Sequence, residues 1–179
     1  MSKKVLVISS SPRKGGNSDI LCDEFIKGAK ESGNTVEKLF IGDMKINYCT
    51  GCGACFNEGK ACPQRDDMPD ILNKMIDSDV IVMASPVYFY TISAQMKTLI
   101  DRTCSRYTEI NGKDFYFIVT AADSSAENLE RSVECFRGFT DCLVDATEKG
   151  VVYGAGAWQS GEIVGTPAMK EAYAFGKSV

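Results

Sequence analysis

Short apolar segments that alternate with amphipathic segments are the feature that most restricts the fold of this chain. The segments KVLVIS (Lys4–Ser9) and DVIVMA (Asp79–Ala84) are apolar through their centres, without alternation between apolar and polar positions. Runs of this kind indicate strands that are covered on both faces. Three further strands are predicted at 35–40, 115–120 and 151–153.

Helical spacing of apolar residues predicts a helix after each strand. The first begins at Asn17 or Ser18 and places Leu21 and Phe25 on one face. Others are predicted from residue 66, over 93–104, over about 126–146 and over 167–177. Buried strands that alternate with amphipathic helices require a parallel sheet with helices on both faces. We therefore predict a flavodoxin-like, doubly wound α/β fold with a five-stranded parallel sheet in the order 2-1-3-4-5.

The size and charge of the chain restrict the number of its domains, its cellular compartment and the kinds of partner it can bind. We expect the 179 residues to form a single domain, 1–179, with a cysteine-rich loop at about 43–65. A net charge of −4 argues against nucleic-acid binding. The apolar run Val5–Ile8 is too short for a signal peptide, and no run approaches the roughly 18 residues of a membrane span. The sequence therefore predicts a cytoplasmic protein with no membrane partner, whose thiols stay reduced.

Ligands of such sheets bind at the carboxyl ends of the strands, where the strand order reverses. The loop after the first strand, SSSPRKGGNS (Ser9–Ser18), combines hydroxyls, two glycines, an arginine and a helix N-terminus. These are the components of an anion site, and the loop matches neither the dinucleotide nor the nucleoside-triphosphate glycine pattern. A phosphate monoester is the ligand that fits best, and a plain connecting turn is the alternative.

Three consecutive aromatic residues follow the third strand, in SPVYFYTIS (Ser85–Ser93). Tyr88, Phe89 and Tyr90 would lie beside the same crevice, and Pro86 fixes the turn. Aromatic side chains favour a flat heteroaromatic ring as the ligand. The alternatives are that they cap the core or contact another subunit.

The segments SSSPRKGGNS, SPVYFYTISAQMKTLIDR and GAGAWQSGEIVGTPAMKEAYAFGK resemble the NADPH-dependent FMN reductase family, in its iron–sulfur-flavoprotein-like branch. The resemblance covers nearly the whole chain and implies FMN as the cofactor and NAD(P)H as an electron donor. It places the FMN phosphate at the first loop, and the isoalloxazine between the aromatic segment and the loop after the fourth strand. The cofactor-binding residues that it implies are Ser9, Ser11, Pro12, Arg13, Gly16, Asn17, Ser18, Pro86, Val87, Tyr88, Phe89, Ala121, Ala122 and Asp123.

Four of the eight cysteines form a C-x2-C-x2-C-x6-C run in the segment YCTGCGACFNEGKACP. They are Cys49, Cys52, Cys55 and Cys62. The compact spacing and the final Cys-Pro resemble cluster-binding loops and imply a [4Fe–4S] cluster. Four thiolates would also suffice for zinc, and a metal-free loop of thiols is the third alternative. The remaining cysteines, which we interpret as core residues of helices, are Cys22, Cys104, Cys135 and Cys142.

These features predict an FMN-dependent oxidoreductase. It would be an NAD(P)H-dependent reductase of flavins or quinones, or an iron–sulfur flavoprotein that passes electrons between a cluster and FMN. The chain has no histidine and we assign no side chain a catalytic role, which suits transfer of hydride or electrons by the cofactor itself. Its partner would be a small redox substrate or an electron-carrier protein. The glycine-rich segment 153–167, with the only tryptophan, predicts a homodimer or homotetramer.

A non-catalytic flavodoxin-type electron carrier or flavin-binding regulator is the alternative function. Its docking face would be formed by acidic residues that otherwise belong to a solvated helix face. They are Asp66, Asp67, Asp70 and Asp77. Oxidation of NADPH in the presence of free flavin or quinone separates the two functions, because a carrier would catalyse almost none.

Overall fold

A computed structural model describes residues 2–56 and 61–179 of the chain. Its strands and α-helices, in chain order, are β1 (Lys4–Ser9), α1 (Asn17–Glu31), β2 (Thr35–Phe40), α2 (Met68–Asp77), β3 (Val80–Pro86), α3 (Ala94–Arg102), β4 (Asp114–Thr120), α4 (Ala126–Thr140), β5 (Thr147–Gly154) and α5 (Pro167–Ser178). The five strands form one parallel sheet in the order β2-β1-β3-β4-β5. The flavodoxin-like fold predicted from the sequence is therefore confirmed.

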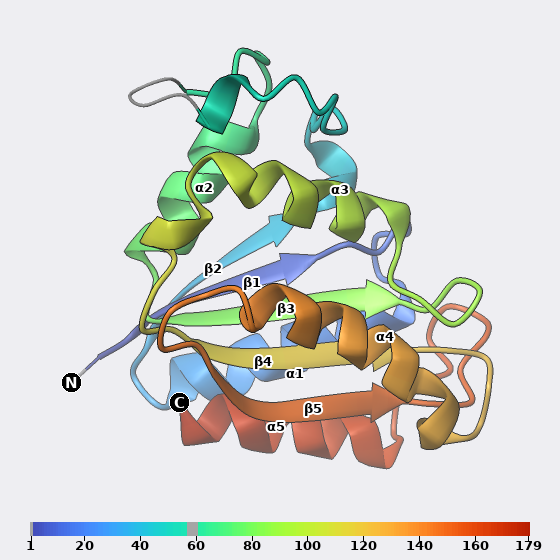
Figure 1. The fold of residues 1–179 in the computed structure, drawn as a ribbon. Helices are drawn as coiled ribbons and strands as arrows, with labels where there is room; N and C mark the ends of the chain where they lie inside the picture. Colours follow the sequence, from blue (N-terminus) through green and yellow to red (C-terminus); the bar gives the residue numbers. More distant parts are fainter. Residues whose placement is uncertain (1, 57–60) are drawn as a thin grey trace.

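Helices cover both faces of the sheet: α1 and α5 lie on one face, and α2, α3 and α4 lie on the other (Figure 1). Alternate residues of β1 enter the two cores. Leu6 and Ile8 pack with α2, α3 and α4, whereas Val5 and Val7 pack with α1 and α5. Both sets are buried, which explains why the strand has no polar face in the sequence. In the described part of the chain, no helix combines the length and apolar content needed to cross a membrane.

The largest difference from the predicted elements is at the end of α4, which stops at Thr140 rather than near residue 146. The N–H groups of Cys142 and Leu143 bond carbonyls only three residues earlier, so the chain tightens into turns. Leu143 is nevertheless buried against the core and extends the apolar pattern past the end of the helix. As a result β5 begins at Thr147, earlier than the predicted residue 151.

Two glycines let α1 and α5 meet backbone to backbone. A Cβ on Gly28 of α1 would lie 2.3 Å from the carbonyl oxygen of Tyr173, and one on Gly176 of α5 would lie 2.1 Å from that of Phe25. The obstructing atoms belong to the backbone, so the closely packed helices would have to separate. We expect Gly28→Ala and Gly176→Ala each to lower the free energy of unfolding by about 3 kcal/mol, measured by urea denaturation.

Gly138 of α4 is the matched control, because nothing lies within 4 Å of a Cβ built there. Alanine is the better helix former, so Gly138→Ala should raise the free energy of unfolding by about 0.5–1 kcal/mol. Equal losses of stability at Gly28 and Gly138 would contradict the packing explanation.

Candidate functional site

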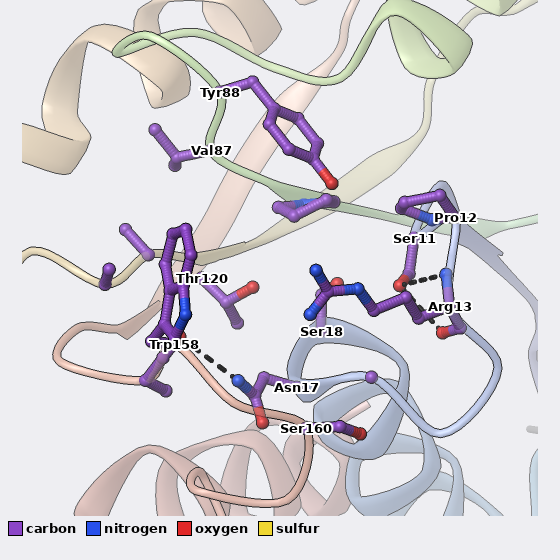
Figure 2. A pocket seen from close by; sticks show the side chains of 15 residues that line it. Ser11, Pro12, Arg13, Asn17, Ser18, Val87, Tyr88, Thr120, Trp158 and Ser160 are labelled. Carbon is purple, nitrogen blue, oxygen red and sulfur yellow. Dashed lines mark hydrogen bonds between the residues drawn. The ribbon is translucent and has the colours of Figure 1, made fainter.

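A pocket opens at the carboxyl edge of the sheet, where the strand order reverses between β1 and β3 (Figure 2). Segments at the ends of β1, β3, β4 and β5 line it. The lining residues are Ser11, Pro12, Arg13, Gly16, Asn17, Ser18, Pro86, Val87, Tyr88, Thr120, Ala121, Ala122, Ala157, Trp158 and Ser160. The structure thus brings together most of the cofactor-binding residues that the resemblance implied.

The loop after β1 curls around the side chain of Ser11. The Ser11 hydroxyl accepts a hydrogen bond from the N–H of Arg13 at 3.1 Å and donates one to the Arg13 carbonyl at 2.8 Å. Gly16 follows at the N-cap of α1, and a Cβ there would lie 2.8 Å from Ser11 Oγ. Glycine therefore keeps this tight turn free of a clash.

Donors for an anion gather at the N-terminus of α1. No side chain of the described residues caps this helix, so its first N–H groups are available to a ligand. Ser18 is 1% exposed, and its buried hydroxyl has no hydrogen-bond partner among those residues. Arg13 extends its guanidinium into the same space (Figure 2). A buried polar group without a partner costs free energy, so the donor set fits a bound phosphate.

Asn17 joins the start of α1 to the segment after β5. Its Nδ2 donates to the carbonyls of Ala157 at 3.2 Å and Gln159 at 2.9 Å. Its Oδ1 accepts from the N–H of Gly161 at 3.0 Å. The resemblance implied that Asn17 binds phosphate. In this structure its side chain lines the pocket and bonds the segment after β5.

Two flat side chains stand at the mouth of the pocket (Figure 2): Tyr88 is 44% exposed and Trp158 is 68% exposed. Tyr88 begins a turn that is closed by reciprocal backbone bonds with Thr91 at 2.9 and 3.1 Å. The central residues of the turn, Phe89 and Tyr90, have φ angles of 50° and 62°. Bulky residues are strained in this left-handed region, and such strain concentrates at functional sites. The flat side chains of Tyr88 and Trp158 make the mouth of the pocket suited to an aromatic ring.

Three of the implied residues lie outside this pocket. Ser9 is fully buried at the end of β1. Phe89 is 99% exposed and, with Asp123, lines a neighbouring hollow. The Asp123 carboxylate accepts a hydrogen bond from the N–H of Ser125 at 2.9 Å, at the start of α4.

The structure adds four pocket residues that the sequence analysis did not assign to the cofactor. They are Thr120, Ala157, Trp158 and Ser160. All four lie at or after the carboxyl ends of β4 and β5. The rule that placed ligands at the ends of the first and third strands would have found them if extended to every strand.

The described residues of the cysteine-rich loop follow β2 and lie on the side of the molecule that carries α2 and α3 (Figure 1). At the start of α3, the N–H of Ser93 donates to Ser85 Oγ at 2.8 Å, beside the pocket. At the other end of α3, Arg102 donates to Cys62 Sγ at 3.6 Å. These two contacts lie at opposite ends of α3, whose 9 residues span about 14 Å at 1.5 Å per residue.

Two of the four loop cysteines are exposed and two are half-buried. Bonds from the N–H of Ala54 and then the Thr50 hydroxyl hold the pKa of the Cys52 thiol below its usual value, which favours the metal-binding thiolate. Within residues 2–56 and 61–179, no group of three or more cysteine or acidic side chains is placed to hold a metal ion. The chemistry of the donors fits a metal, but the thiols are not gathered around one centre.

The interpretation of the other cysteines as core residues is correct only for Cys22, which is fully buried. Cys104 and Cys135 are half-buried and Cys142 is exposed. Cys104 and Cys142 lie beyond the ends of their predicted helices, because α3 ends at Arg102 and α4 ends at Thr140.

Cys104 lies instead beside the cysteine-rich loop. It belongs to the short 3-10 helix Thr103–Ser105, which packs against Ala54–Phe56. Burial and then the neighbouring Cys55 thiol raise the pKa of the Cys104 thiol. The structure therefore places a fifth thiol next to the four that the sequence analysis singled out.

Two acidic residues considered for a docking face have another role. The Asp66 side chain is buried against Arg102. The Asp67 carboxylate accepts a hydrogen bond from the N–H of Lys45 at 2.6 Å. Both residues join the two ends of the cysteine-rich loop, so the expectation of a solvated face is wrong for Asp66.

The model of the NADPH-dependent FMN reductase family matches residues 3–140. The chain belongs to this family. An iron-sulfur flavoprotein of Archaeoglobus fulgidus is 48% identical over 99 residues, which are 55% of this chain and 44% of that protein. Another, from Methanocaldococcus jannaschii, is 45% identical over 100 residues, or 56% of this chain and 51% of that protein. The chain spans about half the length of these curated relatives.

A solved flavone reductase superposes on the FMN reductase fold of this chain with a TM-score of 0.74. The superposition covers 98% of this chain and 61% of that chain, at 21% sequence identity. At this identity the likeness establishes the shared fold alone.

Proposed function

We propose that this chain binds FMN in the carboxyl-edge pocket and acts as an NAD(P)H-dependent oxidoreductase. The observation that carries the proposal is a convergence of donors: the Arg13 guanidinium, the Ser18 hydroxyl and the uncapped N-terminus of α1 meet in one pocket. Such a donor set suits the FMN phosphate. The mouth between Tyr88 and Trp158 suits the flavin ring. Membership of the FMN reductase family supports both assignments.

The residues of the chain would bind and orient the cofactor rather than exchange protons with the substrate. FMN itself supplies hydride and electron transfer when bound. A buried hydroxyl network fixes the loops around it: Ser10 Oγ donates to the carbonyl of Ala84 at 2.8 Å and lies 2.9 Å from Ser93 Oγ. This network ties the ends of β1 and β3 to the start of α3, so the phosphate loop and the aromatic turn keep their relative positions.

Steady-state oxidation of NADPH by protein purified without oxygen, with free flavin or a quinone as acceptor, tests this function. We expect bound FMN and catalytic turnover. Protein that binds FMN but oxidises NADPH no faster than free flavin would instead be a flavodoxin-type electron carrier or a flavin-binding regulator.

The cysteine-rich loop is the proposed site of a [4Fe–4S] cluster that exchanges electrons with FMN. Four thiols on one segment and the favoured thiolate of Cys52 support it. The names of the iron-sulfur flavoproteins among the relatives also support it. Gly51 and Gly53 have φ angles of 65° and 70° with open space beside them, which leaves the loop room to close around a cluster. A small redox substrate or an electron-carrier protein would then receive the electrons.

Tyr88→Ala should lower the affinity for FMN about tenfold, because an aromatic contact at the mouth of the pocket is lost. The affinity for inorganic phosphate should stay unchanged, since Tyr88 lies across the pocket from the phosphate donors. Fluorescence titration with FMN, and its displacement by inorganic phosphate, measure the two affinities. Phe89→Ala is the comparison, because Phe89 follows Tyr88 in the same turn but lies outside the pocket. Equal losses in both variants would place the ring elsewhere.

Association into a homodimer or homotetramer is also proposed. Phe89, Tyr90 and Trp158 are exposed around the pocket, and exposed aromatic groups of this kind are typical of interfaces. Sedimentation velocity at micromolar concentration should give two or four times the mass of the 179-residue chain. A species with the mass of one chain would contradict the proposal.

A further inference from the structure

A buried ion pair ties the end of α3 to the cysteine-rich loop. The side chains of Arg102 and Asp66 are 2% and 0% exposed. Arg102 Nη1 donates to one carboxylate oxygen at 2.5 Å, and Nη2 donates to the other at 3.1 Å. Removing two charges from water offsets most of what such a pair gains, so stability alone does not account for it.

The two Nη nitrogens of the guanidinium also contact the loop beyond Asp66. Arg102 Nη1 donates to the carbonyl of Asn47 at 2.7 Å, and Nη2 donates to Cys62 Sγ at 3.6 Å. Asp66 in turn accepts a hydrogen bond from the N–H of Asn47 at 2.9 Å. One side chain therefore contacts the chain before the first loop cysteine and the last loop cysteine itself.

The charge state of the pair is well defined. Burial acts to raise the pKa of the Asp66 carboxyl, but the Arg102 guanidinium and the N–H groups of Asn47 and Met68 outweigh it and hold that pKa below its usual value. Asp66 is thus ionised at neutral pH, and the fork of Arg102 is fixed in orientation by its two bonds to the carboxylate.

We propose that Arg102, oriented by Asp66, is a positioning residue that holds Cys62 in place for the cluster and donates an N–H bond to its sulfur. The second part of this inference rests on the proposed cluster. An N–H donor stabilises the state in which the sulfur carries more negative charge, which is the reduced state. Hydrogen bonds to cluster sulfurs are among the factors that set reduction potentials, so the bond raises the midpoint potential.

The test uses a double variant, Arg102→Met with Asp66→Asn, because removing one charge alone would leave the other buried and unpaired. The double variant removes a positive and a negative charge together, so the lost N–H bond dominates any change in potential. Arg102→Lys keeps the charge but not the fork. Arg106→Lys is the matched control, since Arg106 makes an exposed ion pair with Glu109 nearby in the chain.

Two measurements separate the parts of the proposal. Trypsin cleavage after the exposed Lys45, in cluster-free protein, should be about tenfold faster in the double variant, because Asn47 nearby loses its bonds to Arg102 and Asp66. The rate should be intermediate in Arg102→Lys and unchanged in Arg106→Lys. After anaerobic reconstitution, the midpoint potential should be more negative in both Arg102 variants, while their FMN content stays the same.

An unchanged rate of cleavage, or an unchanged midpoint potential in cluster-bearing protein, would overturn the role of Arg102. Wild-type protein that takes up no iron would refute the cluster, not the positioning of the loop, because the cleavage comparison does not depend on iron.

Discussion

Replacing Arg13 by glutamate should lower the affinity for FMN by about a hundredfold, because a charge-assisted hydrogen bond becomes a repulsion between two negative groups. Arg13 lines the pocket, and its guanidinium lies in the space that the Ser18 hydroxyl also faces (Figure 2). Riboflavin, which lacks the phosphate, should lose little affinity. Isothermal titration of the flavin-free variant with both compounds measures the difference.

Lys14→Glu is the matched control for this prediction. It makes the same change of charge one residue along the chain, but Lys14 does not line the pocket, and its ammonium pairs with the Asp43 carboxylate at 2.5 Å on the surface. We expect FMN affinity to change less than threefold, since solvent and salt screen a surface charge that lies outside the pocket. Retention of FMN by the Arg13 variant at the wild-type affinity would place the phosphate elsewhere.

The fold could be predicted because each strand and helix carries its own pattern of apolar residues. Leu6 and Ile8 enter one core and Val5 and Val7 enter the other, so the run of four apolar residues already indicated a strand covered on both faces. The end of α4 could not be predicted in the same way. Leu143 lies in a turn after the helix but is still buried. An apolar residue at this position has the same spacing in the sequence as a buried residue of a longer helix.

The sequence predicted the pocket residues that stand together in one loop. It did not predict the contacts between residues far apart in the chain. Ser11, Arg13 and Ser18 stand in one loop with a recognisable composition, and the structure brings them together. Asn17 contacts Gln159 at a separation of 142 residues, and Arg102 contacts Cys62 at a separation of 40 residues. Contacts of this kind depend on how elements pack, which no local pattern of residues reports.

Replacing Cys52 by serine should abolish iron binding while FMN stays bound at the wild-type ratio. Serine keeps the size of the side chain but removes the thiolate, whose formation the Ala54 N–H and the Thr50 hydroxyl favour at this position. Anaerobically reconstituted wild-type protein should contain about four irons per chain, and the variant should contain less than about one. Iron, acid-labile sulfide and the visible spectrum measure the loss.

Cys52→Ser is informative because the cysteine-rich loop and the pocket are separate sites. Cys62 contacts one end of α3 and the pocket lies near the other end, and the substitution alters nothing in this helix. Cys142→Ser, which changes an exposed cysteine outside the loop, should leave both iron and FMN unchanged. Loss of FMN together with iron in the Cys52 variant would mean that the loop supports the flavin pocket. A wild-type chain without iron after anaerobic reconstitution would leave the thiols without a cluster, and the proposed oxidoreductase activity would then depend on FMN alone.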